Sequence, residues 1–268
     1  MKANITDLNG TSARTAELPM QFEEEYRPDL IRRAFIAIQT SKRSSYGAKP
    51  GAGMRYSSKL SRRRRDFKGA YNKGISRVPR KTITRRGMQF NWIGATSPNT
   101  VGGRRSHPPK AEKIWKENIN VKERRKAIRS ALAATINKEL VIKRGHKAKN
   151  VFPIIMDARI EDVKKTKEII ELLKKLGLKA EIARVSDVKV RSGIGKNRGR
   201  RHQNKAGILF IISKDCKLFK SARNIAGCDV AIVNNLNAEL LAPGGDAGRL
   251  CIWSETAIER LGKEGLFL

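Results

Sequence analysis

Two stretches of the sequence carry the residues whose types and spacing are best suited to chemistry, and both are rich in Lys and Arg. Residues 46–108 hold sixteen Lys or Arg and one acid, Asp66. Residues 188–207 hold seven Lys or Arg and no acid. Guanidinium groups bind phosphate oxygens in pairs, and ammonium groups bind them as point charges. The pattern therefore predicts phosphate binding, and the net charge of +33 indicates a polyanionic partner.

The stretch 46–108 lacks the periodicity of a folded domain. Its large apolar residues occur singly, and Gly or Pro interrupts it every few residues. Arg62 to Arg65 form the densest cationic run, and aromatic residues are spaced among the cations. These aromatic residues are Tyr46, Tyr56, Phe67, Tyr71, Phe90 and Trp92. Nucleobases stack on such rings, which flexible linkers seldom carry, so we expect an extended arm that is disordered alone and ordered by RNA.

The stretch 188–207 contains Gly193, Gly195 and Gly199, which invites comparison with nucleotide-binding glycine loops. The dinucleotide fingerprint fails because Arg198 stands where its third glycine belongs. No Gly-Lys-Ser/Thr follows, so the phosphate-loop pattern fails too. A basic loop that grips RNA backbone fits better. The predicted RNA-binding residues of both stretches are Arg55, Lys59, Arg62, Arg63, Arg64, Arg65, Lys68, Arg104, Arg105, Arg191, Lys196, Arg198, Arg200 and Arg201.

The other candidates for catalysis or metal binding are isolated. Asp157 follows a predicted strand, where catalytic acids occur, but no second acid pairs with it and a helix-capping role is favoured. We expect the separate histidines His107, His146 and His202 to contact RNA or solvent. The acidic run Glu23 to Glu25 is interpreted as a solvated or partner-facing patch. No catalytic residue, metal site or cofactor is therefore predicted.

The three cysteines Cys216, Cys228 and Cys251 are widely spaced and odd in number, which is typical of reduced, partly buried thiols. The N-terminal residues lack a signal-peptide pattern, and no apolar run approaches the roughly 20 residues of a membrane span. The sequence therefore predicts a cytoplasmic protein with no membrane partner.

Helix and strand patterns alternate on both sides of the arm. Helices are expected from Pro28 to about Ser41, after Asn120, over 160–177, over 217–227 and after Ser254. The helix after Asn120 has an apolar stripe of Ile128, Leu132, Ile136 and Leu140, and Ser254 is expected to cap the last helix. Strands are expected over 151–156, 180–185, 207–212, 229–233 and 250–253. This order predicts an α/β fold: a mostly parallel, Rossmann-like sheet with helices on both faces, interrupted by the long extended basic arm.

The expected domains follow from this order. Residues 1–45 and 109–268 form a globular α/β domain, 46–108 form the inserted arm, and 188–207 form a basic RNA-binding loop. We also expect the ends of the arm, near Tyr46 and Pro109, to lie close together.

Several motifs carry a resemblance to a known family. The segments RSALAAT, GGRRSHPPKAEK, RSGIGKNRGRRHQNKAG and LAPGGDAGRLCIWSE are very similar to those of the fourth protein of the large ribosomal subunit. The similarity runs from about Pro28 to Leu261, and the chain resembles the archaeal form of this protein.

The resemblance implies a structural protein without catalysis, whose α/β domain lies on ribosomal RNA and whose arm reaches the wall of the nascent-peptide exit tunnel. It also implies contacts with neighbouring large-subunit proteins, one of which contributes a loop to the same tunnel constriction. Aligned on GISRVPR, the arm tip falls at about Arg77 to Gly87, which is bulkier and less Gly-rich than in many relatives. The tunnel-proximal tip residues would be Arg77, Val78, Pro79, Arg80, Lys81, Arg85 and Arg86.

Two alternatives from other classes stay open at this point. One is a Rossmann-like RNA-modifying enzyme whose basic loops hold its substrate, although the cofactor glycines and an acid pair are missing. The other is a free regulatory RNA binder outside the ribosome. Saturable cofactor binding would favour the first alternative, and absence from the large subunit in a sucrose gradient would favour the second.

Overall fold

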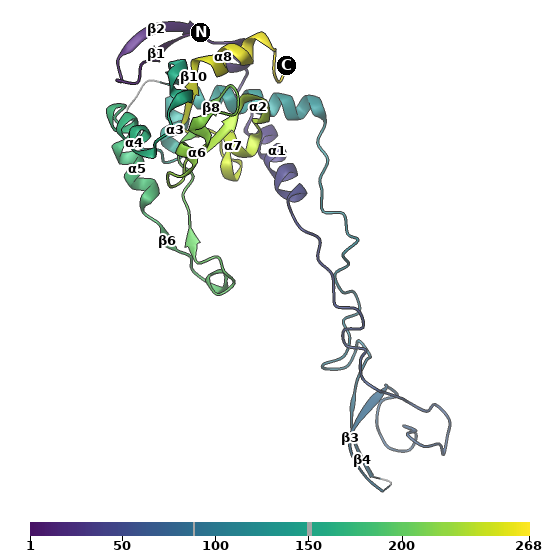
Figure 1. Cartoon of the computed structure of the whole chain (residues 1–268). Coiled ribbons are helices and arrows are strands. Elements are labelled where there is room, and N and C mark those ends of the chain that lie inside the picture. The colour runs from purple at the N-terminus through teal and green to yellow at the C-terminus, as the bar shows by residue number, and fades with distance from the viewer. Residues whose placement is uncertain (88, 149–151) are drawn as a thin grey trace. The chain divides into compact units, whose positions relative to one another are not determined.

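The computed structural model describes residues 1–87, 89–148 and 152–268. The chain divides into two compact units. The globular unit consists of Met1–Lys42 and Lys116–Leu268, and the arm unit consists of Arg43–Trp115. Figure 1 gives the element labels.

The globular unit is built on a six-stranded sheet with the strand order β2-β1-β5-β10-β8-β9. The strands are β1 (Lys2–Thr6), β2 (Ser12–Glu17), β5 (Ile154–Met156), β8 (Leu209–Ile212), β9 (Asp229–Ile232) and β10 (Cys251–Ser254). Only β1 and β2 pair antiparallel, and the other neighbours in this sheet pair parallel. The expected α/β class with a mostly parallel sheet is thus confirmed, although β1 and β2 were not predicted.

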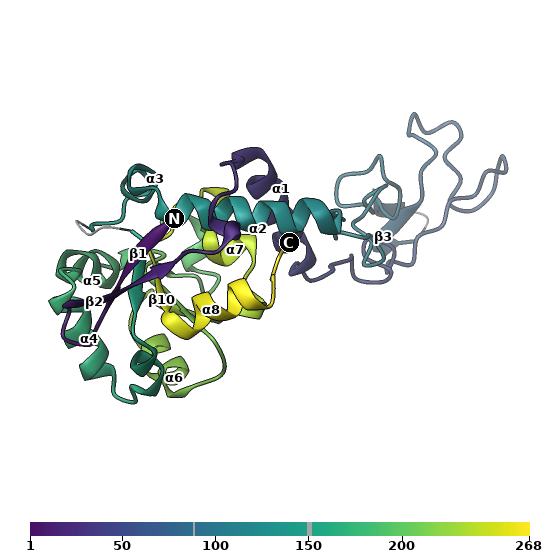
Figure 2. The same ribbon diagram turned by 90° about the horizontal axis from the view of Figure 1, so that it is seen from above.

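Helices pack on both faces of this sheet (Figures 1 and 2). They are α1 (Pro28–Ser41), α2 (Val121–Ile136), α3 (Lys138–Lys143), α4 (Thr166–Lys175), α5 (Lys179–Ser186), α6 (Lys217–Arg223), α7 (Ala238–Leu241) and α8 (Glu255–Lys263). Short 3-10 turns occur at Met20–Phe22, Ala158–Asp162, Ile194–Lys196, Val233–Asn235 and Pro243–Gly245. None of the helices in the described ranges is long and apolar enough to cross a bilayer.

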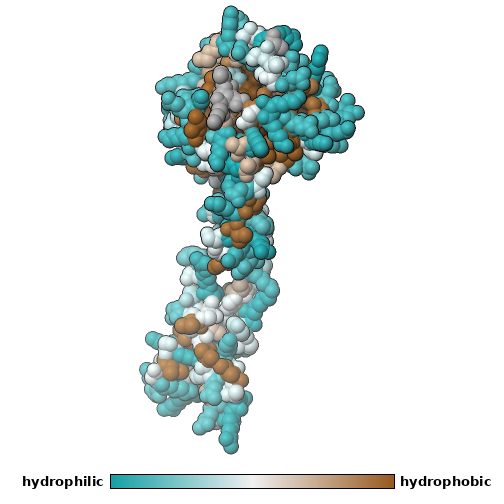
Figure 3. All heavy atoms as spheres, turned by 90° about the vertical axis from the view of Figure 1, so that its left-hand side faces the viewer, coloured by the Kyte–Doolittle hydropathy of each residue, from teal (hydrophilic) through white to brown (hydrophobic). Residues whose placement is uncertain are grey.

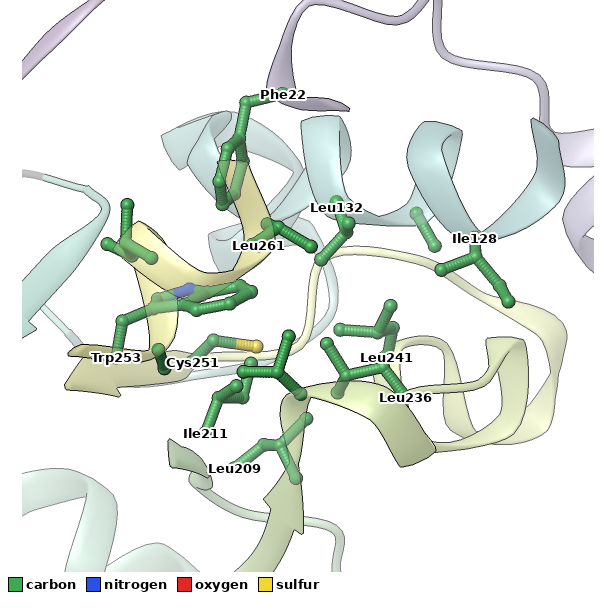
Figure 4. Packing of buried hydrophobic residues seen from close by; sticks show 14 of the residues in the cluster. Phe22, Ile128, Leu132, Leu209, Ile211, Leu236, Leu241, Cys251, Trp253 and Leu261 are labelled. Atoms are coloured by element: carbon green, nitrogen blue, oxygen red, sulfur yellow. The ribbon is translucent and has the colours of Figure 1, made fainter. Parts of the chain in front are cut away.

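Successive residues of β8 point to opposite faces of the sheet and so supply two cores. Leu209 and Ile211 face α2 and α8, where Phe22 and Trp253 meet edge to face with centroids 5.2 Å apart (Figure 4). Phe210 and Ile212 face α4 and α6. Strands buried on both faces form apolar runs rather than alternating patterns, which explains GILFII in the sequence.

The segment 180–185, predicted to be a strand, lies in helix α5, so that prediction is wrong. Its apparent alternation is also compatible with helical spacing. The i, i+3, i+4, i+7 spacing of a helix face is met by Leu178, Glu181, Ile182 and Val185. These residues are buried or partly buried. Ala, Glu and Arg are good helix formers, and they favour the helix.

The helix after Asn120 ends at Ile136, and α3 follows at once. The Oδ1 of Asn137 accepts from the Glu139 amide at 3.0 Å and caps α3, whereas Asn120 makes no side-chain cap bond. The predicted apolar stripe is therefore shared by two helices. Ile128 and Leu132 are buried, and Ile136 and Leu140 pack partly buried against the same core.

Other predicted boundaries agree more closely with the structure. Helix α1 begins at Pro28, and the Ser254 hydroxyl caps α8 by accepting from the Ala257 amide at 3.2 Å. The helix expected over 160–177 is α4, which starts only at Thr166. The strand expected over 151–156 is β5, and its first residue, Val151, is outside the described residues.

The arm unit contains a hairpin of β3 (Arg80–Arg86) and β4 (Gln89–Gly94), which pair antiparallel. This hairpin was not predicted, because 46–108 showed no periodicity of a folded domain. The signal was the β-branched run Thr82 to Thr84 before the turn, with Phe90 and Trp92 alternating after it. Gly87, with a φ of 56°, supplies the left-handed backbone at the turn.

The two ends of the arm unit lie together, as expected from the sequence. The Ala48 amide donates to the Pro109 carbonyl oxygen at 3.0 Å. Further along, a Cβ atom on Gly53 would lie 2.5 Å from the Arg104 Cα, so this close approach requires glycine.

Candidate nucleic-acid interface

The cations predicted to bind RNA in the arm unit have no acidic partner among the residues that the structure describes. Every ion pair found among the described residues lies in the globular unit. Arg55, Lys59, Arg62 to Arg65 and Arg105 are exposed, and Lys68 and Arg104 are partly buried. The lone acid near the run, Asp66, accepts from Ser61 Oγ at 2.5 Å and from the Phe67 amide at 2.7 Å instead. These cations are therefore available to an external anion.

The aromatic rings of the arm unit contact one another and nearby cations. Phe67 and Phe90 meet edge to face with centroids 5.2 Å apart, and Arg85 lies 5.5 Å from the Phe67 centroid. Lys81 lies 3.7 Å from the Tyr56 centroid. Ring and cation thus already stack within the chain, an arrangement in which nucleobases can also take part.

The residues assigned to the arm tip lie on the β3–β4 hairpin and on the segment before it. Arg77, Arg85 and Arg86 are exposed, whereas Val78, Pro79 and Lys81 are partly buried. Arg80 differs from them because it is buried, with Nη2 donating to Ser76 Oγ at 3.3 Å. Its guanidinium lies 5.4 Å from the Trp92 ring centroid. Arg80 therefore supports the hairpin from within.

The loop 188–207 is a small hairpin of β6 (Lys189–Val190) and β7 (His202–Gln203). The Arg191 amide donates to the Arg201 carbonyl oxygen at 2.7 Å. Gly193 and Gly199 both have a φ of 80°, which other residues adopt only with strain. The side chains of the five predicted RNA-binding residues here, Arg191, Lys196, Arg198, Arg200 and Arg201, are exposed.

These five cations also lack an acidic partner within the described ranges. Lys205, at the base of the hairpin, does form an ion pair, with its Nζ 2.7 Å from Asp187 Oδ2. Hydrophilic side chains cover most of the surface in view in Figure 3. Both predicted stretches therefore present cations to solvent, as binding of a polyphosphate requires.

Two isolated titratable residues have structural positions that the sequence did not predict. His146 is buried, with Nδ1 2.7 Å from Glu181 Oε1, so the prediction that it contacts RNA or solvent is wrong. Asp157 makes no side-chain cap bond, which overturns the capping prediction. It lies 3.8 Å from Arg14 Nη2 and 3.7 Å from Arg159 Nε instead. The pairs of His146 with Glu181 and of Asp157 with Arg14 join residues far apart in sequence and leave no local signal.

The acidic run Glu23 to Glu25 is only partly solvated. Glu24 accepts from Arg129 Nε at 2.7 Å, which holds its pKa below the ordinary value despite partial burial. Glu23 and Glu25 are exposed. The interpretation as a solvated patch is therefore wrong for Glu24.

The carboxyl ends of β8 and β10 are where open α/β sheets bind ligands. Here the buried carboxylate of Glu161 occupies this position. It accepts from the Ser213 amide at 2.9 Å, from Ser254 Oγ at 2.7 Å and from Thr256 Oγ1 at 2.7 Å. Burial raises the pKa of Glu161, but these hydrogen bonds outweigh it and the net pKa lies below its usual value. An internal carboxylate thus fills the usual ligand position.

The cysteines are free thiols, as predicted, with Cys228 and Cys251 buried and Cys216 partly buried. Burial raises the pKa of Cys228 to about 11 and that of Cys251 to about 12. Within the described residues, no His, Cys, Asp and Glu side chains form a group of three suited to a metal ion.

Fold and site together define a class of protein: an α/β protein that carries exposed cations on a glycine-rich insertion and on a second hairpin. Residues 16–264 match the model of the ribosomal protein L4/L1 family. The chain belongs to this family, as its motifs indicated, and the family consists of structural ribosomal components and not of enzymes.

Curated relatives match over nearly the whole chain. The large ribosomal subunit protein uL4 of Nanoarchaeum equitans is 47% identical over 268 residues, covering 100% of both chains. The protein of the same name from Archaeoglobus fulgidus is 41% identical over 264 residues, covering 98% of this chain and 99% of the relative. That of Methanocaldococcus jannaschii is 42% identical, covering 97% and 98%.

Proposed function

We propose that this chain is a structural component of the large ribosomal subunit that binds ribosomal RNA through the arm 46–108 and the loop 188–207. The observation that carries the proposal is the set of exposed cations in both segments that have no acidic partner among the described residues. Family membership supports the ribosomal setting, since the relatives are named as large-subunit proteins. The protein would act in translation in the cytoplasm, as part of the ribosome.

The arm is proposed to be extended on RNA and to reach the wall of the nascent-peptide exit tunnel with the β3–β4 hairpin as its tip. The hairpin supports this proposal because it has only two strands and exposes Arg85 and Arg86, and Arg77 is exposed on the segment just before it. Neighbouring large-subunit proteins, including the one whose loop shares the constriction, are the proposed protein partners. The globular unit, with its Rossmann-like arrangement, would lie on RNA as the anchor.

Sucrose-gradient sedimentation of cell extract at high salt tests the ribosomal assignment. We expect the protein to sediment with the large subunit and to stay bound at salt concentrations that strip loosely attached proteins. A protein found only at the top of the gradient would contradict the proposal and favour a free RNA binder. Cross-linking of the arm to RNA within isolated subunits would then test the path of the arm, with Lys81 and Arg85 as the informative positions.

A further inference from the structure

The β6–β7 hairpin leaves the globular unit between α5 and β8 and extends away from the rest of that unit (Figure 1). Its strands β6 and β7 have two residues each, and Arg191 adds bonds across the hairpin from its amide to the Arg201 carbonyl oxygen and from its Nε to the Arg200 carbonyl oxygen. Its direction therefore depends on the residues at its base, Arg184 to Asp187 on one side and Lys205 to Gly207 on the other.

Arg184 connects the two sides of this base. Its Nη2 donates to the Ala206 carbonyl oxygen at 2.8 Å and to Glu181 Oε1 at 2.7 Å, and its Nε donates to Glu181 Oε2 at 2.9 Å. A planar guanidinium can make these bonds at the same time, whereas an ammonium group cannot reproduce the fork.

Glu181 is itself held from a distant segment. Its side chain is 0% exposed, and it lies 2.7 Å from His146 Nδ1 and accepts from the Lys147 amide at 2.9 Å. The carboxylate is thus held by His146 and the Lys147 amide in addition to Arg184. A fixed carboxylate in turn fixes the guanidinium that holds Ala206.

The neighbours of Ala206 are held in the same way. Lys205 Nζ donates to the Arg184 carbonyl oxygen at 3.0 Å and to Asp187 Oδ2 at 2.7 Å. The Gly207 carbonyl oxygen accepts from Nε of the buried Arg249 at 2.9 Å. Three consecutive residues at the base are therefore anchored by charged groups.

We propose that Arg184 is a positioning residue for RNA binding: anchored by Glu181, it fixes the direction of the β6–β7 hairpin so that the exposed cations meet phosphates in one orientation. This rests on the proposed function of the loop. If the base loosened, only a fraction of molecules would hold the hairpin in the binding orientation, and the apparent affinity would fall by that fraction.

The first test is Arg184→Lys in the full chain, with binding to transcribed large-subunit ribosomal RNA measured across a salt series. We expect the affinity to fall about tenfold, because fewer molecules would hold the hairpin in the binding orientation. The slope of log K against log salt should stay unchanged, because the net charge is unchanged. The unfolding midpoint should stay close to that of the parent protein. Arg159→Lys is the matched control, because the Arg159 side chain is 82% exposed and pairs only with Asp157 in the described ranges.

Asp187→Ala is the second variant, and its side chain is 66% exposed, so the fold should tolerate the change. Removing an acid beside a polyanion should tighten RNA binding on electrostatic grounds alone. Loss of the Lys205 anchor should weaken it instead, and weaker binding is the result we expect. Tighter binding would overturn the positioning role.

A triple variant, Arg198→Ala with Arg200→Ala and Arg201→Ala, separates this inference from the proposed function. If the triple variant weakens binding and flattens the salt slope while Arg184→Lys behaves like Arg159→Lys, the loop binds RNA but Arg184 does not position it. If the triple variant binds RNA as the parent protein does, the loop 188–207 has no role in RNA binding. The proposed function of this loop and the positioning role of Arg184 would then both be wrong. A fall in affinity that tracks a lowered unfolding midpoint would make Arg184 merely structural.

Discussion

The rings of Tyr46 and Trp115 stack with centroids 5.5 Å apart and planes inclined by 17°. The two residues lie at opposite ends of the arm unit, and the Arg43 guanidinium lies 3.9 Å from the Trp115 centroid. Aromatic and cation–π contacts thus close the segment at its root, together with the bond from Ala48 to Pro109. An insertion closed at its root has fewer conformations to lose on binding RNA.

Tyr46→Leu should loosen this root in the free protein. An aromatic pair contributes about 0.5–1.5 kcal/mol beyond burial, so hydrogen exchange of the Ala48 amide should become about two- to tenfold faster. Tyr46→Phe keeps the ring and should exchange like the parent protein. Equal rates in all three proteins would mean that the stack does not hold the ends.

The remainder of the arm is predicted to take its shape from RNA. An isolated two-stranded hairpin is marginally stable at best, so without RNA we expect weak protection from hydrogen exchange in β3–β4 and almost none elsewhere in 46–108. Addition of ribosomal RNA should protect the whole segment. Strong protection throughout 46–108 in the free protein would show that the arm has a fold of its own.

The globular unit should fold without the arm unit. Glu117 donates from its amide to Thr40 Oγ1 at 3.2 Å, so the chain on either side of the insertion already lies together. Both flanking helices contribute to one core, through Ile31 of α1 and Ile128 of α2. Replacing 43–115 by a short Gly-Ser linker should therefore leave a single cooperative urea transition. A broad, non-cooperative transition would show that the arm unit is needed for the core.

The fold could be predicted from the sequence where the signal is local. Pro28 begins α1, Ser254 caps α8, and the apolar runs of β5, β8 and β10 can be recognised because strands buried on both faces need them. The secondary structure of the segment 180–185 could not be predicted, because its short apolar pattern fits both the helix period and the strand period. Local pattern therefore leaves such short segments undetermined.

The buried polar network was also beyond prediction. Glu181 lies 35 residues from His146, and Arg249 lies 42 residues from Gly207. Only the folded sheet brings these groups together. In sequence they look like ordinary surface charges, since Glu and Arg are rarely fully buried unless paired.

Glu181 should make the globular unit sensitive to acid. Burial raises the pKa of its carboxyl, but hydrogen bonds from Arg184, His146 and the Lys147 amide outweigh burial and bring the pKa from 4.5 to about 2. Because the folded pKa lies below the unfolded value, the stabilisation is complete above about pH 4.5 and is lost as the pH falls toward about 2.

Glu181→Gln should accordingly reduce the loss of stability between pH 4.5 and pH 2, measured by urea unfolding. At pH 7 it should destabilise by about 1.5–3 kcal/mol, because the buried position of Glu181 would no longer offer a charged acceptor to its hydrogen-bond donors. Glu168→Gln, at an exposed position on α4, serves as the control. It should leave unchanged both the stability at pH 7 and the loss of stability between pH 4.5 and pH 2. An identical acid profile for parent and Glu181→Gln would show that this carboxyl does not govern the transition.

The run Arg62 to Arg65 should bind phosphates in a way that is visible in the salt dependence of RNA binding. All four side chains are exposed and without acidic partners in the part of the arm unit that the structure describes. Changing them to Gln should weaken binding at every RNA sequence and flatten the slope of log K against log salt by about 0.7–0.9 for each phosphate that is no longer bound. The matched control changes four exposed lysines around α4 to Gln, at Lys164, Lys167, Lys174 and Lys179, and removes the same charge. Because net charge alone would affect both variants equally, a flatter slope only in the arginine variant assigns the phosphate binding to the arm. Equal slopes in the two variants would mean that the run provides general attraction without touching phosphate.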